Sequence, residues 1–185
     1  MAKARIRTAA KASRDAHFAA LFPAERCAAA IMVAERVTQH LGAPKIVAVY
    51  LPIGSECDPL PLIDRLEGLG LRLALPHVTG RRGLMRFLAW TPGEPLPAGP
   101  MGLRQPVHDA EELVPDAVIV PLLAFDATLH RLGYGAGHYD RALVQLRDAR
   151  RIGLGWEVQR VDALPVDSWD IPLHAVATET HWYAA

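Results

Sequence analysis

Short apolar runs recur along the chain, and most are separated by stretches with a different periodicity. The runs are rich in β-branched residues, are bounded by turn-forming residues and predict strands at 45–51, 71–75, 85–90, 117–120, 151–155 and 175–178. Between several of them, apolar residues repeat every three or four positions, which is typical of a helix with one buried face. Because strands separated by helices form βαβ units, this pattern predicts a mainly parallel sheet.

Proline and glycine mark where the predicted helices begin and end. Pro23 suits the first turn of a helix, and Gly42 suits the position just after a last turn. Asp58 followed by Pro59 is a good helix start, because the aspartate can cap the first N–H groups. We therefore expect helices at about 6–18, 24–40 and 58–69, and a further one that runs through 142–146.

Prolines also mark the ends of two predicted strands. Pro76 and Pro121 lack the N–H group that a central strand needs, so each should end the strand before it. Acidic residues at 109–112 could open a short helix before the strand at 117–120. The segment 91–107 is crowded with proline and glycine and predicts an ordered loop, of a length that is usually functional or mobile.

These elements predict one α/β domain over residues 1–185. We expect a mainly parallel twisted sheet with helices on both faces, a Rossmann-like three-layer sandwich. The 185 residues and 20.2 kDa suit one unit with a substantial core. Basic and acidic residues number 20 each and the pI is 7.1, so net charge gives no general attraction to nucleic acid or to an anionic membrane. No apolar run approaches the roughly 18 residues that span a bilayer.

The N-terminus and the two cysteines bear on location. The first residues are basic, which leaves an organellar presequence open as an alternative, but no apolar signal-peptide stretch follows them. Cys27 and Cys57 have no metal-binding spacing, so free thiols in a reducing cytoplasm are expected, with a disulfide as the alternative. We expect a cytoplasmic monomer that acts on small molecules, without nucleic acid or membrane.

A glycine-rich loop at 131–141, RLGYGAGHYDR, carries the strongest chemical signal. It follows the predicted strand at 117–120 and leads into a helix. Gly133, Gly135 and Gly137 let the backbone approach a ligand closely, and several N–H groups can then converge on an anion at the helix start. Arg131 and Arg141 flank the loop with charge that suits phosphate. The alternative is a tight connection with solvated arginines, but the density of polar and aromatic residues favours a phosphate site.

Two common phosphate-binding motifs are excluded. No Lys-Ser or Lys-Thr pair follows the glycines, as a Walker A loop requires. The dinucleotide fingerprint requires its third glycine one position later. A different kind of phosphate site is therefore predicted.

RLGYGAGHYDR resembles the R-x-G-x-G-x-G-x-Y-D-R signature of the 5-formyltetrahydrofolate cyclo-ligase family, also called methenyltetrahydrofolate synthetases. The preceding VPLLAFD, the N-terminal KARIR and the YLPIGSE stretch are similar to further motifs of that family. The likeness extends over nearly the whole chain. Where the family commonly has tyrosine or phenylalanine, this chain has His138, so we do not expect a general base there.

The resemblance implies an ATP site. From the basic N-terminal motif, Lys3 and Arg7 would reach the phosphates, and their spacing of one helical turn lets both point to one side. Without the resemblance, a solvated helix end would be the better interpretation. Arg131 and Arg141 would stabilise charge, and no covalent nucleophile is implied. The full set implied to bind ATP is Lys3, Arg7, Arg131, Gly133, Tyr134, Gly135, Ala136, Gly137, His138, Tyr139 and Arg141.

A folate pocket and a metal site are implied as well. Glu56, a lone loop glutamate that would otherwise be taken as a surface charge, would contact the folate, and Leu51 would line the same pocket. Trp90 and Tyr134 lie next to loops and could flank a flat ring. Asp140 could cap a helix or pair with Arg141, but a carboxylate beside phosphates also suits Mg²⁺. The resemblance favours the metal role, with Asp170 as a second candidate ligand.

The implied reaction converts 5-formyltetrahydrofolate and ATP into 5,10-methenyltetrahydrofolate, ADP and phosphate with Mg²⁺. The formyl oxygen would attack the γ-phosphate, N10 would close the ring and phosphate would leave. Two alternatives remain open at this point: a nucleotide- or folate-binding module without turnover, and a different small-molecule kinase.

Overall fold

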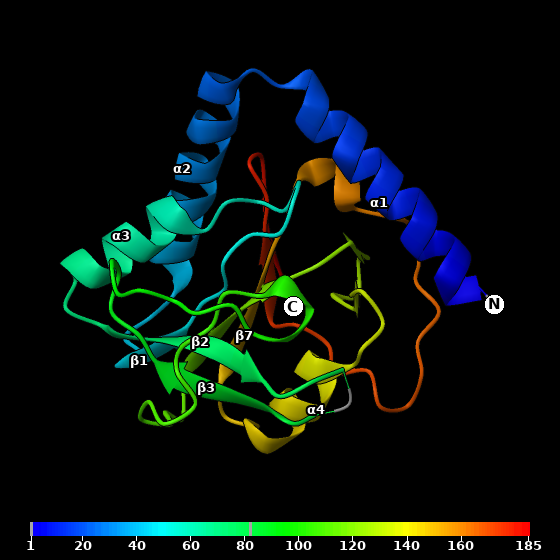
Figure 1. Cartoon of the computed structure of the whole chain (residues 1–185). Helices are drawn as coiled ribbons and strands as arrows, with labels where there is room; N and C mark the ends of the chain where they lie inside the picture. Colours follow the sequence, from blue (N-terminus) through cyan, green and yellow to red (C-terminus); the bar gives the residue numbers. More distant parts are fainter. Residues whose placement is uncertain (1, 82) are drawn as a thin grey trace.

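A seven-stranded sheet forms the centre of the computed structural model, which describes residues 2–81 and 83–185 (Figure 1). Its strand order is β3-β2-β1-β4-β7-β8-β9. The strands from β2 to β8 are parallel, and the edge strands β3 and β9 are antiparallel to their neighbours. The strands are β1 (Ile46–Ala48), β2 (Arg72–Val78), β3 (Met85–Ala89), β4 (Ala117–Pro121), β7 (Arg150–Leu154), β8 (Ala175–Ala177) and β9 (Trp182–Ala184).

Helices cover both faces of this sheet, as predicted. Helices α2 (Pro23–His40) and α3 (Leu60–Gly68) pack against one face, and α4 (His138–Gln145) packs against the other. Side chains alternate between the two layers along β4: Ile119 joins the core under α2 and α3, while Val118 and Val120 join the core under α4. Both faces of β4 are therefore buried, which explains its continuous apolar run.

Helix α1 (Ala2–Ala20) lies apart from the sheet layers and runs beside the loops at one side of the molecule (Figure 1). Ile6 and Ala10 on this helix pack against a small cluster that contains Ala124, Leu132 and Leu164. Within the described part of the chain, no single helix is long and apolar enough to cross a membrane. Only α1 and α2 together pass that test, and they are bent by 117°.

Short connecting elements complete the chain. A small hairpin, β5 (Ala124–Phe125) with β6 (Arg131–Leu132), follows β4, and two 3₁₀ turns lie at Pro100–Gly102 and Glu157–Gln159. Neither this hairpin nor the edge strand β9 was predicted. Each has two or three residues in a strand and depends on a partner elsewhere in the fold.

Several predicted element boundaries were wrong, among them the strand predicted at 45–51, which spans only Ile46–Ala48. Strand β2 continues through Pro76 to Val78, and β4 includes Pro121. Beyond Ala74, β2 pairs only with β3, so a proline there leaves the ladder to β1 intact. No helix forms at 109–112: the chain turns at 108–110, and Glu112 forms an isolated bridge with Leu88.

His77 on β2 makes the stability of the fold depend on pH. Its side chain is buried, and its Nδ1 has no hydrogen-bond partner among the described residues. Burial, and then the charges of Arg86 and His108, lower the pKa of His77 below its ordinary value of 6.5. The unfolded chain therefore takes up this proton first, and the free energy of unfolding should fall as the pH drops below 6.5.

We expect His77→Phe to reduce this acid sensitivity, because phenylalanine keeps a ring in the core but cannot bind a proton. The measurement is the difference in Tm between pH 7 and pH 5 for the wild type and the variant. The variant should show the smaller difference. Equal differences would contradict the role assigned to His77.

Candidate active site

The loops that follow β1 and β4 meet at one edge of the sheet, because these strands are adjacent and parallel. The loop after β1 carries Glu56, whose side chain is buried with 4% exposed. Its Oε2 accepts a hydrogen bond from the Ile53 N–H at 2.8 Å. Its Oε1 is also buried but has no hydrogen-bond partner within the described residues. Glu56 is therefore a buried carboxylate with one oxygen available to a ligand.

Burial of Glu56 disfavours the ionised form of its carboxyl group. Burial raises the pKa of Glu56, although the Ile53 N–H and the charge of Arg14 oppose the shift. A buried carboxylate of this kind gains by accepting hydrogen bonds from ligand N–H donors.

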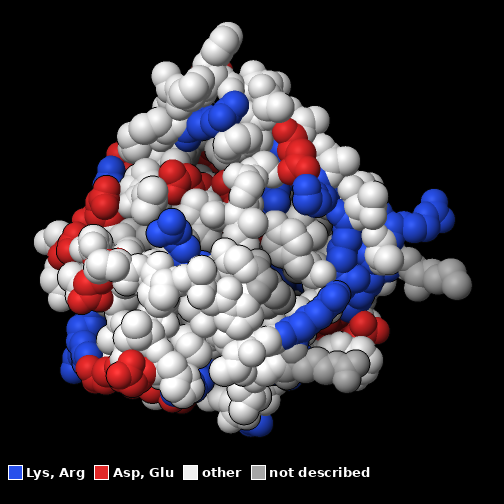
Figure 2. All heavy atoms as spheres, viewed as in Figure 1, with Lys and Arg blue, Asp and Glu red and all other residues white. Residues whose placement is uncertain are grey.

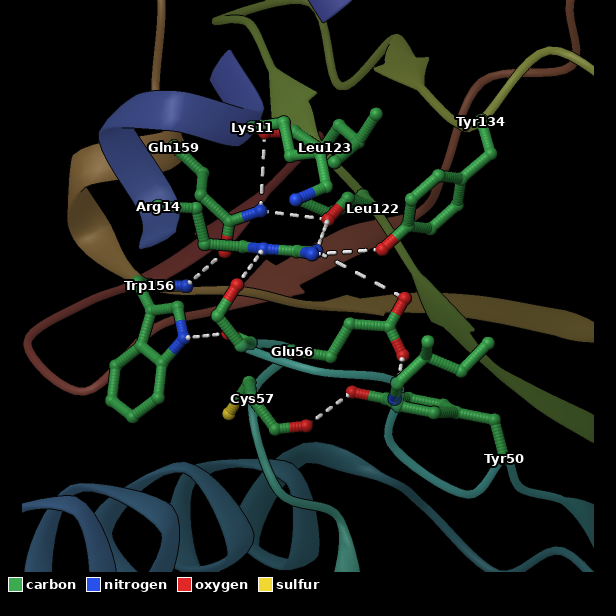
Figure 3. Close-up of polar contacts among 12 residues, drawn as sticks. Lys11, Arg14, Tyr50, Glu56, Cys57, Leu122, Leu123, Tyr134, Trp156 and Gln159 are labelled. Atoms are coloured by element: carbon green, nitrogen blue, oxygen red, sulfur yellow. Dashed lines mark hydrogen bonds and ion pairs between the residues drawn. The ribbon is translucent and has the colours of Figure 1, made fainter. Parts of the chain in front are cut away.

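Arg14 of α1 lies beside Glu56 and was not predicted from the sequence (Figure 3). It is 1% exposed, and its Nη1 lies 3.9 Å from Glu56 Oε1. Its Nη2 donates to the Tyr134 hydroxyl at 2.7 Å. A sequence signal did exist, since Lys3, Arg7 and Arg14 fall on one face of a helix, but nothing local indicated burial.

Of the three other residues predicted to contact the folate, Leu51 and Tyr134 lie in the loops at this edge. Trp90 lies at the opposite end of the sheet, where its backbone N–H donates to the Leu73 carbonyl at the start of β2 at 3.1 Å. Tyr134 is 47% exposed, and its hydroxyl faces inward to Arg14, so the ring is accessible from outside. Trp90 is 8% exposed, and its indole Nε1 donates to the Glu94 carbonyl at 3.4 Å. Leu51 is partly buried against the core cluster that includes Trp90. In this structure Trp90 is mainly a core side chain, whereas Tyr134 offers an open ring.

Two glycines of the loop adopt positive φ angles, as expected for a loop that needs glycine. Gly135 and Gly137 have φ values of 95° and 67°, in the region that favours glycine. Gly137 is the residue that precedes α4. Arg7 donates from Nε to the Gly133 carbonyl at 2.9 Å, and a Cβ on Gly135 would lie 3.1 Å from Arg7 Cζ. The structure thus brings Arg7 and the loop together, although they are far apart in the sequence.

Arg141 and His138 lie at the start of α4. Arg141 Nη1 donates to the Ala136 carbonyl at 2.8 Å, and Nη2 lies 3.1 Å from His138 Nδ1. Burial, together with the charge of Arg141, lowers the pKa of His138. Since the arginine can only donate, Nδ1 is the acceptor of that contact. His138 Nε2 and Arg141 Nε are buried without a partner in the described chain, so both retain hydrogen-bonding capacity.

Three ion pairs hold the remaining predicted phosphate and metal ligands. Arg131 Nη2 donates to Asp140 Oδ1 at 2.7 Å, so Asp140 pairs with Arg131 and not with Arg141. Lys3 Nζ contacts Asp170, and lies 2.6 Å from Asp167. Burial acts to lower the pKa of Lys3, but hydrogen bonds and charge from both aspartates raise it. The structure therefore pairs Lys3 and Arg131 with the two candidate metal ligands.

The described residues contain no cluster of three or more His, Cys, Asp or Glu side chains that could hold a metal ion by themselves. A Mg²⁺ ion that is bound largely through phosphate oxygens and water needs only one or two protein carboxylates. Asp140 and Asp170 have the appropriate oxygen chemistry, and Arg131 acts electrostatically on both.

A support network fixes Arg14 and Glu56 and was also missed from the sequence. Ser55 Oγ accepts from Arg14 Nε at 3.0 Å and donates to Asp15. Trp156 Nε1 donates to the Ser55 carbonyl at 3.0 Å. Gln159 Nε2 donates to the Leu122 carbonyl at 2.7 Å, and Arg14 Nη1 reaches the same oxygen at 3.4 Å. The site is therefore built from α1, both loops and the turn at Glu157–Gln159.

Positive charge gathers beside this site on the surface. Figure 2 shows a band of Lys and Arg side chains along the side of the molecule where α1 lies. On α1, Lys3 and Arg7 are partly exposed and contact Asp170 and the glycine loop, whereas Arg14 is buried. Although the net charge of the chain is zero, the local charge suits an anionic ligand.

Known proteins are similar to this chain in sequence. A family model described as the 5-formyltetrahydrofolate cyclo-ligase family matches residues 1–179. The 5-formyltetrahydrofolate cyclo-ligase of Escherichia coli (strain K12) is 38% identical over 139 residues, which are 71% of this chain and 76% of that protein. The protein of the same name from Mycolicibacterium smegmatis is 34% identical over 142 residues, 72% of this chain and 73% of the relative.

Solved structures are similar over the full length. The NMR structure of Aquifex aeolicus 5,10-methenyltetrahydrofolate synthetase has a TM-score of 0.82 and 30% identity, with 100% of this chain and 93% of that chain covered. A Mycoplasma pneumoniae 5,10-methenyltetrahydrofolate synthetase shares the fold, with a TM-score of 0.74, 24% identity and coverage of 97% and 99%. The resemblance noted in the glycine loop is thus confirmed along the chain, and the protein belongs to the 5-formyltetrahydrofolate cyclo-ligase family.

Proposed function

We propose that the protein catalyses the ATP- and Mg²⁺-dependent cyclisation of 5-formyltetrahydrofolate to 5,10-methenyltetrahydrofolate, with release of ADP and phosphate. Family membership supports the reaction. The observation that carries it to this chain is the buried, half-unpaired carboxylate of Glu56, which Arg14 links to Tyr134 of the glycine loop. One site can therefore serve a ring with N–H donors and a polyphosphate together.

The nucleotide would bind at the glycine loop. Backbone N–H groups from Gly133 to Tyr139 and the start of α4 would face the phosphates. Lys3, Arg7, Arg131 and Arg141 would supply positive charge, and phosphoryl transfer depends mostly on such positioning and charge neutralisation.

The ion pairs of the structure suggest how metal and nucleotide are coupled. Phosphate oxygens would compete for Lys3 and Arg131, which would release Asp170 and Asp140 as oxygen ligands. Mg²⁺ held by these carboxylates would neutralise phosphate charge when bound. Asp140 lies in the first turn of α4, three residues after Gly137, so it is the better placed of the two.

The folate would bind on the Glu56 side of the site. Glu56 Oε1 would accept from ring N–H groups, and the open ring of Tyr134 would cover a face of the pterin, with Leu51 lining the pocket. Trp90, at the other end of the sheet, is left out of this site. The formyl oxygen would attack the γ-phosphate and N10 would close the ring, with phosphate as the leaving group. No covalent bond to the protein is needed.

The test uses purified protein with 5-formyltetrahydrofolate, ATP and Mg²⁺. Near-ultraviolet absorbance of the methenyl product and ADP release should grow in equal amounts. Binding of folate or nucleotide without either signal would favour a module without turnover. ATP consumption that ignores the formylfolate would favour another small-molecule kinase. A monomeric state and a cytoplasmic location stay predictions, to be checked by light scattering and fractionation.

A further inference from the structure

Among the described residues of α1, only Arg14 is buried, although the rest of this helix is largely exposed. A guanidinium at 1% exposure loses its hydration and requires partners on several sides. Ser55 Oγ at 3.0 Å, the Leu122 carbonyl at 3.4 Å and the Tyr134 hydroxyl at 2.7 Å provide them. These partners come from the loop after β1 and the segments after β4. Arg14 is therefore a fixed charge at the junction of both halves of the site.

The contact with Glu56 differs from these hydrogen bonds. Arg14 Nη1 lies 3.9 Å from Glu56 Oε1, which is too far for a hydrogen bond but close enough for a strong charge interaction in a buried setting. Because Arg14 directs its N–H groups to Ser55, Leu122 and Tyr134, Glu56 Oε1 keeps its lone pairs. The guanidinium of Arg14 therefore places a positive charge near Glu56 Oε1 without donating a hydrogen bond to that oxygen.

The surrounding contacts hold this geometry in place. Ser55 is fixed by Asp15 through its hydroxyl and by Trp156 through its carbonyl. The Leu122 carbonyl is held by Gln159. Figure 3 shows the guanidinium of Arg14 between the carboxylate of Glu56 and the side chains of Tyr134 and Gln159. A side chain with fewer donors could not satisfy all of these groups at once.

We propose that Arg14 is a positioning residue for the folate half of the site, which places a positive charge beside Glu56 Oε1 without occupying it and orients the Tyr134 ring through its hydroxyl. This inference rests on the proposed function. It gives α1 a second role, because Arg7 reaches the glycine loop near one end of the helix, while Arg14 shapes the folate contact two turns later.

The test compares Arg14→Met and Arg14→Lys with the wild type, and uses Arg5→Met as the matched control because Arg5 is exposed on the same helix. For Arg14→Met we expect kcat/KM for 5-formyltetrahydrofolate to fall about 10²-fold, while KM for ATP changes less than about twofold. Arg14→Lys should recover part of the loss, since it keeps the charge but not the contact with Tyr134. Arg5→Met should match the wild type.

A pH profile separates positioning from general support of the fold. The charged and titratable groups around Glu56 are Arg14, Tyr134, Tyr50, Tyr139, Cys57 and Asp58. Of these, the charge of Arg14 and the Tyr134 hydroxyl favour the ionised carboxylate, and Arg14 is the only cation. The acid limb of kcat/KM for the folate should therefore move to higher pH in Arg14→Met and much less in Arg14→Lys.

Equal losses in the folate and ATP constants, with an unmoved acid limb, would overturn the inference, because they would indicate a purely structural role. If Arg14→Met does not fold, Arg14→Lys and Tyr134→Phe still decide the question: both should raise KM for the folate and leave KM for ATP unchanged, and unchanged folate constants in both would also overturn it. A wild type without cyclisation would instead contradict the proposed function itself.

Discussion

Glu56→Gln should lower kcat/KM for 5-formyltetrahydrofolate by about 100-fold or more in a protein that stays folded. Hydrogen bonds to a charged partner contribute about 1.5–3 kcal/mol each. In the variant, an amide NH₂ group replaces one of the two carboxylate oxygens. This NH₂ donor would then face another donor, either the ring N–H groups of the folate or the Ile53 N–H. Steady-state kinetics with each substrate varied in turn would measure this, with Glu67→Gln, an exposed change on α3, as the control.

The same variant carries a stability signature. Because the folded protein raises the pKa of Glu56 above its ordinary 4.5, the folded state holds that proton more tightly than the unfolded chain does. The contribution of Glu56 to the free energy of unfolding therefore falls as the pH rises through this range. The difference in Tm, Glu56→Gln minus wild type, should therefore be more positive at pH 7 than at pH 4.5. A relative Tm that moves in the opposite direction would contradict the account of a buried, charged Glu56.

Gly135→Ala should weaken ATP binding about tenfold or more and leave KM for the folate nearly unchanged. Its φ of 95° disfavours any side chain, and the new Cβ would crowd Arg7, which lies at 3.1 Å. Loss of one charged phosphate contact costs about 1.5–3 kcal/mol, which corresponds to tenfold or more in affinity. The measurement is the Kd for ATP by calorimetry.

The matched control is Gly70→Ala. Gly70 has a φ of 74°, but a Cβ there meets nothing within 4 Å, and it lies after α3 and not in the candidate site. Both alanine variants should lose about 1 kcal/mol or more of stability through backbone strain. Only Gly135→Ala should lose ATP affinity. Equal ATP affinity in the two variants would remove the case for Arg7 and the loop as one phosphate site.

The sheet could be predicted from the sequence because its central strands carry their own signal. Val118, Ile119 and Val120 are buried on both faces and form a continuous apolar run, which local sequence alone displays. Edge strand β9 has no such run, since its residues are at most partly buried, and its pairing with β8 sets it. Pro76 was predicted to end its strand because proline has no N–H for a central ladder. At that position β2 pairs with β3 alone, so the strand continues.

The candidate site divides in the same way. The glycine loop could be found because its residues are consecutive and their backbone needs are local. Arg14 could not, because burial of an arginine on an alanine-rich helix depends on loops that arrive more than forty positions later. The pairing of Lys3 with Asp170 joins residues 167 positions apart, so only the folded chain reveals it. Long-range partners decide what a charged side chain does, and sequence spacing does not display them.

The most direct test of the proposed reaction follows the formyl oxygen. 5-Formyltetrahydrofolate labelled with ¹⁸O in the formyl group would be converted with ATP and Mg²⁺, and the inorganic phosphate would be analysed by mass spectrometry. Attack of that oxygen on the γ-phosphate predicts one ¹⁸O atom in each phosphate released, in step with methenyl product. Unlabelled phosphate, with its oxygen taken from water, would contradict the account, because ATP would then be hydrolysed without activation of the formyl group.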